Sequence, residues 1–115
     1  MLETGRADAF VLDSQVLASS IATARNPKNF KIVGAPLSVE PIAIMIRKDD
    51  PAFKKAVDDS ITRQVKDGTV ARLYDKWFMQ PIPPSNTSLN LPASAATKAA
   101  WANLNDKPAE AYKAD

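Results

Sequence analysis

A short apolar run near the N-terminus constrains the fold more than any other feature of the sequence. Residues 9–12 (Ala-Phe-Val-Leu) are consecutive and apolar, and the acid Asp13 follows them directly. Successive side chains of a strand point to opposite faces, so an unbroken apolar run indicates a strand that is buried on both faces. Such strands are typical of parallel sheets that carry helices on both sides. The pattern predicts a buried strand over residues 7–12 and an α/β fold.

A helix and a second strand are predicted to follow. Apolar residues recur at helical spacing from Ser14 to Arg25, and Asn26-Pro27 ends that pattern. Residues 30–33 indicate another short strand. The order strand, helix, strand is that of a βαβ unit, which cannot cover both faces of its own sheet. We therefore expect further structure before this unit.

A third strand and two amphipathic helices are predicted in the middle of the chain. Residues 42–47 form the strand, and Asp50 followed by a proline predicts a capped helix start. The apolar stripe of that helix is Phe53, Val57, Ile61 and Val65. We expect this helix and the next to pack against a sheet.

The sequence Asp67-Gly68-Thr69 predicts the junction between those two helices, with Gly68 in the left-handed conformation and Thr69 as the N-cap of the second. That second helix is expected to end at Phe78. The remaining chain is rich in small and polar residues, and residues 94–103 predict a short helix around Trp101 that Ser94 caps.

Composition excludes several classes of function. The 115 residues include neither Cys nor His, which removes thiolate sites and the usual parts of zinc and Ser-His catalysis. The net charge of +2 comes from interspersed signs, so nucleic-acid binding is not indicated. No apolar run approaches the roughly 20 residues of a membrane span. The N-terminus lacks the pattern of a signal peptide.

Four stretches taken together resemble one known family. They are "LETGRADAFVLD" (2–13), residues 32–61, "DGTVARLYDKWF" (67–78) and "PIPPSNTSLNLP" (81–92). The chain resembles the C-terminal portion of a periplasmic amino-acid-binding protein of an ABC transporter, in the glutamate/aspartate branch of the polar amino-acid family. The resemblance covers nearly the whole chain.

The resemblance implies a partial periplasmic-binding-protein type II fold, in which two α/β lobes close on a ligand. Residues 1–34 would end the second lobe, and residues 35–41 would be the crossing hinge strand. Residues 42–80 would complete part of the first lobe, and 81–115 would form the C-terminal extension with its helical tail. Pieces of both lobes are expected, neither of them whole.

Asp13 is the principal candidate ligand residue. The resemblance implies that its carboxylate accepts the α-ammonium group of an amino acid. The alternative is that Asp13 or Ser14 caps the following helix. Glu40 is a candidate lobe contact in the hinge, or simply an exposed acid. Arg6, in a turn, is expected to be solvated or to pair locally.

The leading hypothesis is a non-enzymatic binding component for glutamate or aspartate that works with a membrane permease in the periplasm. The surface charges Lys54, Lys55 and Asp59 could contribute to docking on the permease. No cofactor or metal is expected. One alternative is a dehydratase-like enzyme of the same fold. Another is a folded remnant without ligand binding, held together as a homodimer or an element-swapped oligomer. For the chain alone, weak or absent glutamate binding is expected.

Overall fold

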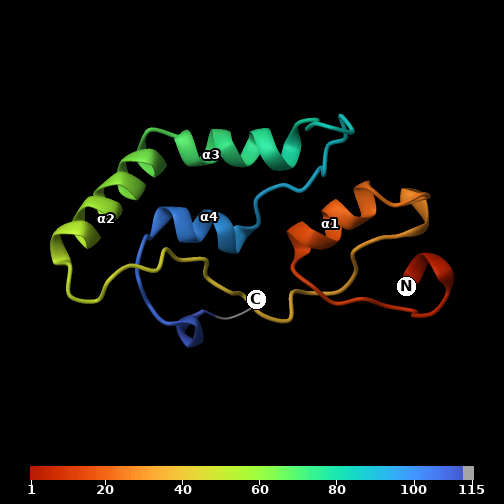
Figure 1. Ribbon diagram of the computed structural model, residues 1–115, viewed down its shortest axis with the longest axis horizontal. Helices are drawn as coiled ribbons and strands as arrows, with labels where there is room; N and C mark the ends of the chain where they lie inside the picture. The colour runs from red at the N-terminus through yellow and green to blue at the C-terminus, as the bar shows by residue number, and fades with distance from the viewer. Residues whose placement is uncertain (113–115) are drawn as a thin grey trace. The chain divides into compact units, whose positions relative to one another are not determined.

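The computed structural model describes residues 1–112 and consists mainly of helices (Figure 1). Its α-helices are α1 (Ser14–Ala22), α2 (Pro51–Lys66), α3 (Thr69–Tyr74) and α4 (Ala95–Ala102). Helix α3 continues into a π-helical turn, η3 (Asp75–Met79). Short 3₁₀ turns occur at η1 (Leu2–Thr4), η2 (Pro27–Asn29) and η4 (Ala109–Ala111).

The chain divides into two compact units. Unit 1 combines Met1–Gly34 with Asp75–Pro92, and unit 2 combines Ala35–Tyr74 with Ala93–Asp115. Each unit therefore joins segments that are distant in the sequence.

In unit 1, the N-terminal turn is tied to the end of α1. The backbone N–H of Arg25 donates to the Glu3 carboxylate at 2.8 Å. Ala18 on α1 is the one buried apolar residue among those described. The segment after η3 folds back on itself, because the Ser88 hydroxyl donates to the Met79 carbonyl at 2.7 Å.

In unit 2, α2 packs with α3, and the junction between them is tightly bonded. Gly68 has φ of +77°, which is the left-handed conformation predicted for it. The Asp67 carboxylate accepts the backbone N–H of Thr69 at 2.9 Å. Arg72 donates to the Asp67 carbonyl at 2.9 Å and to the Thr69 hydroxyl at 2.8 Å.

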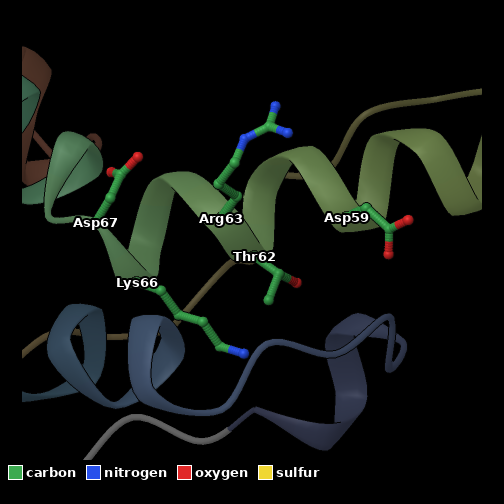
Figure 2. Close-up of a pocket in the computed structure, with 5 residues that line it drawn as sticks. All are labelled: Asp59, Thr62, Arg63, Lys66 and Asp67. Atoms are coloured by element: carbon green, nitrogen blue, oxygen red, sulfur yellow. The ribbon is translucent and has the colours of Figure 1, made fainter.

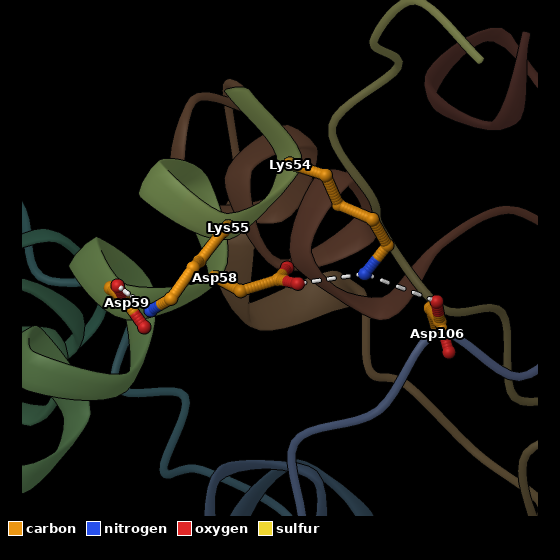
Figure 3. A network of polar contacts seen from close by, with 5 residues as sticks. All are labelled: Lys54, Lys55, Asp58, Asp59 and Asp106. Atoms are coloured by element: carbon orange, nitrogen blue, oxygen red, sulfur yellow. Dashed lines mark hydrogen bonds and ion pairs between the residues drawn. The ribbon is translucent and has the colours of Figure 1, made fainter. Parts of the chain in front are cut away.

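The C-terminal segment of unit 2 is attached to the same helix pair by two contacts. Tyr74 and Trp101 meet edge to face, with ring centroids 5.5 Å apart. The Lys54 ammonium lies 2.7 Å from the Asp58 carboxylate and 3.3 Å from that of Asp106 (Figure 3). The tail therefore forms part of the unit's packing.

The predicted helices and two predicted caps are confirmed. The Asp50 carboxylate accepts the Phe53 N–H at 2.9 Å at the start of α2. The Ser94 hydroxyl accepts the Thr97 N–H at 3.0 Å at the start of α4. The N-cap predicted at Thr69 is wrong, because Thr69 is the first residue of α3 and its N–H is bonded by Asp67.

The predicted strands at 7–12, 30–33 and 42–47 are wrong for this chain. Among the described residues, the β-pairing consists of an isolated bridge between Ile82 and Thr87. A strand is defined by ladder hydrogen bonds to a neighbour, and the three apolar segments have no such neighbour. The sheet expected beneath the helix pair is absent from the described residues for the same reason, and α2 packs on α3 instead.

Candidate functional site

Asp13 lies at the N-cap position of α1, where the irregular segment 9–12 enters the helix. Its backbone has φ of −53° and ψ of 135°, and its carbonyl accepts the Leu17 N–H at 2.9 Å. The residue is exposed. A carboxylate at this position stands beside the positive end of the helix dipole, which stabilises its ionised form.

The side-chain cap proposed as the alternative role is absent. Asp13 makes no side-chain capping hydrogen bond to α1. Ser14 is already the first residue of the helix, and its hydroxyl donates to the Gln15 side chain at 3.2 Å. The local interaction that would have occupied the Asp13 carboxylate is therefore missing, and the N–H groups of the first turn receive no bond from it.

Arg6 pairs locally, as predicted. Its Nε donates to the Thr4 hydroxyl at 3.2 Å, and its backbone N–H donates to the Met1 carbonyl at 3.2 Å. These bonds hold the N-terminal turn around Gly5. Nothing in them directs the guanidinium to Asp13.

Glu40 lies in unit 2, whereas Asp13 lies in unit 1. Its carboxylate is exposed and accepts a bond of 3.4 Å from the Ser38 hydroxyl two residues away. This is a local loop contact. The role of Glu40 as a contact between lobes stays a prediction.

A shallow hollow of about 430 Å³ lies on α2 and is lined by Asp59, Thr62, Arg63, Lys66 and Asp67. Figure 2 shows that all five come from this helix and its C-terminal end, and that Arg63 and Lys66 point away from each other. A ligand site requires polar groups that converge on one point. The hollow is therefore a charged helix surface and does not form a candidate site.

The lysines considered for permease docking are already paired within unit 2. The Lys55 ammonium lies 2.6 Å from the Asp59 carboxylate (Figure 3). Hydrogen bonds to Asp58 and Asp106 raise the pKa of Lys54, and the bond to Asp59 raises the pKa of Lys55. The i,i+4 pairs were readable from helical spacing, but the Asp106 contact was not, because it joins residues far apart in the sequence.

Neither a metal site nor a membrane span is present in the part of the chain that the structure describes. No group of three or more acidic side chains in residues 1–112 could hold an ion. None of the helices described there is long and apolar enough to cross a bilayer. The candidate chemistry in unit 1 is thus that of one exposed carboxylate at a helix N-terminus.

Comparison with known proteins identifies relatives over almost the entire chain. The glutamate/aspartate import solute-binding protein of Escherichia coli is 46% identical over 106 residues, which are 92% of this chain and 35% of that protein. The L-glutamate/L-aspartate-binding protein of Pseudomonas aeruginosa is 46% identical over 110 residues, or 96% of this chain and 36% of that protein. The chain spans about a third of the length of these relatives.

More distant relatives match a shorter part. The glutamine-binding protein of an ABC transporter in Bacillus subtilis is 29% identical over 79 residues, which are 69% of this chain and 28% of that protein. The names of all three relatives describe binding proteins and not enzymes. The family of bacterial extracellular solute-binding proteins, family 3, matches residues 3–80. That family implies a periplasmic-binding-protein type II fold. The chain belongs to the bacterial extracellular solute-binding proteins of family 3.

Proposed function

We propose that this chain contributes to a glutamate- or aspartate-binding component of an ABC importer. The proposal is supported by the 46% identity to two glutamate/aspartate-binding proteins, while the glutamine-binding relative is only 29% identical. Those two matches are long enough that they must include residues 10–106 of the chain. The chain's own contribution to the ligand site is Asp13.

The observation that carries this role is the uncapped Asp13 carboxylate at the start of α1. An α-amino acid brings an ammonium group and a carboxylate that are attached to the same carbon. The Asp13 carboxylate would accept a charge-assisted bond from the ammonium group. The first-turn N–H groups of α1 would suit the ligand's carboxylate, because they are donors at the positive end of a helix dipole.

The remaining assignments concern the intact family fold. Residues 1–34 would belong to the second lobe, 35–41 to the hinge, 42–80 to the first lobe and 81–115 to the C-terminal extension. Lobe closure around the ligand would be driven by a higher affinity of the closed state for it. Glu40 would join the lobes in one of the two states. The partner would be the importer's membrane permease, and the location would be the periplasm.

The affinity expected for the chain alone is low. One charge-assisted hydrogen bond contributes about 1.5–3 kcal/mol. A Kd of about 1 mM already requires about 4.1 kcal/mol. With Asp13 as its main ligand contact, the chain should therefore bind glutamate with a Kd of about 5–80 mM.

The test is a titration of ¹⁵N-labelled chain with L-glutamate and L-aspartate, followed through the amide resonances of residues 13–16. We expect small, saturable shifts confined to the start of α1. Asp13→Asn should abolish them, because the amide keeps the size of the side chain and removes its charge. Asp8→Asn is the matched control, since Asp8 is another exposed acid of unit 1.

Two results would contradict the proposal. One is the absence of any saturable shift at residues 13–16 over the whole titration. The other is an equal response in the wild-type chain and in Asp13→Asn, which would place the binding elsewhere. Loss of the response in Asp8→Asn alone would likewise move the site away from Asp13.

A further inference from the structure

Three apolar segments are exposed and lack backbone partners. Residues 9–12 and 30–33 lie in unit 1, and residues 42–46 lie in unit 2. None of the three forms a β-ladder. In unit 2, the side chains of Ile42 and Met45 are 102% and 97% exposed. Apolar side chains exposed in such runs mark a surface that another chain covers.

Both faces of these segments are uncovered. Phe10, Val11 and Leu12 are 55%, 71% and 46% exposed, although neighbours in an extended segment point to opposite sides. Ile32 and Val33 repeat the pattern at 45% and 70%. The missing cover must therefore supply hydrogen-bonding strands beside the segments and apolar layers on both of their faces.

We propose that these segments are a docking surface for a polypeptide that supplies the portion of a family 3 solute-binding protein outside the region matched by this chain. The two glutamate/aspartate-binding relatives match 92–96% of this chain, which is only 35–36% of their own lengths. About two thirds of each relative therefore consists of chain that the present sequence does not contain. That portion is large enough to provide both strands and covering helices.

Other occupants fit less well. A lipid surface would cover the side chains but would leave the backbone N–H and C=O groups of the segments unsatisfied. A second copy, as the self-association predicted from the sequence would supply, brings only the same three apolar segments and the same helices. It could extend an edge, but it adds no element to cover the faces.

The experiment uses the 115-residue chain and a polypeptide comprising the unmatched two thirds of the Escherichia coli relative. The two are mixed in urea, refolded together by dilution without any amino acid, and examined by sedimentation and amide hydrogen exchange. We expect a 1:1 complex in which the amides of the three segments exchange at least about 100-fold more slowly than in the chain alone. The matching third of the Escherichia coli relative serves as the control partner.

Substitutions locate the surface. Val11→Asp in unit 1 and Ile44→Asp in unit 2 should each weaken the complex more than about tenfold, because each buries an unpaired carboxylate. Leu104→Asp is the matched control, because Leu104 is an exposed apolar residue outside the three segments, and it should change the affinity less than about twofold.

The proposal would be overturned if the control third formed a complex and the present chain did not. It would also be overturned if the chain alone self-associated and showed the same protection in the three segments. It goes beyond the proposed ligand role. Because the complex is measured without amino acid, a failure here and a failure at Asp13 are distinguishable.

Discussion

Replacing Trp101 with Ala should release the C-terminal segment of unit 2 from α3. The Trp101 ring meets the Tyr74 ring edge to face, with a centroid distance of 5.5 Å and an interplanar angle of 71°. Helix α4 has only eight residues, and a helix of that length is marginal without tertiary packing. Its protection should therefore depend on this contact.

The magnitude follows from the burial of the ring. Truncation of a fully buried Phe or Trp to Ala costs about 3–5 kcal/mol. Trp101 is partly exposed, so we expect a cost of about 2 kcal/mol, within which the aromatic pair accounts for about 0.5–1.5 kcal/mol. A change of 2 kcal/mol in the free energy of local opening corresponds to about a 30-fold change in the opening equilibrium.

The assay is amide hydrogen exchange of α4, measured at Lys98 and Asn103, whose N–H groups bond to the carbonyls of Ser94 and Ala99. In Trp101→Ala both amides should exchange about 30-fold faster. Trp77→Ala is the matched control, because Trp77 is 48% exposed and belongs to unit 1's η3. Unchanged α4 exchange in Trp101→Ala would refute the reasoning.

Three further perturbations test the capping and charge interactions. Asp50→Ala should lower the unfolding free energy by about 1 kcal/mol through loss of the α2 cap, with Asp50→Asn restoring most of it in urea unfolding followed by circular dichroism; equal stability of all three proteins would contradict this. Hydrogen bonding from Thr69 lowers the pKa of Asp67, so its contribution is present above the unfolded pKa of 3.8 and is lost as pH falls through the folded value. Asp67→Asn should therefore flatten the acid limb of the stability curve, and an unaltered limb would contradict that. The exposed pair Lys54–Asp106 should show a coupling below about 1 kcal/mol in a double-mutant cycle with Lys54→Met and Asp106→Asn, and a coupling that salt does not reduce would contradict a simple surface pair.

The helices were predictable because their determinants are local. The cap at Asp50, the apolar stripe of α2 and the positive φ of Gly68 each depend on residues within a few positions of one another. The short α4 was predictable in the same way from Ser94 and the alanines that follow. These interactions are complete within the chain.

The strands at 7–12, 30–33 and 42–47 were not predictable as formed elements. Apolar runs report how buried a segment is in its intended fold, whereas a strand also requires hydrogen bonds from neighbours elsewhere in the polypeptide. Those neighbours are absent from the described residues. The sequence pattern thus describes a fold that this chain does not complete by itself.

The candidate site was predictable in position and not in detail. The end of an apolar run placed Asp13 at a helix start, which the structure bears out. Whether the carboxylate caps that helix depends on its rotamer, and spacing alone does not specify a rotamer. The contact between Lys54 and Asp106 was invisible for a different reason, since it requires the tail to fold back on α2.

The most direct test of the central claim, that Asp13 receives an α-ammonium group, compares L-glutamate with glutarate. The two ligands have the same carbon chain and both carboxylates, but glutarate lacks the ammonium group. Titration of the labelled chain should give saturable shifts at residues 13–16 with L-glutamate and none with glutarate. Equal shifts and equal affinities for the two ligands would contradict the claim.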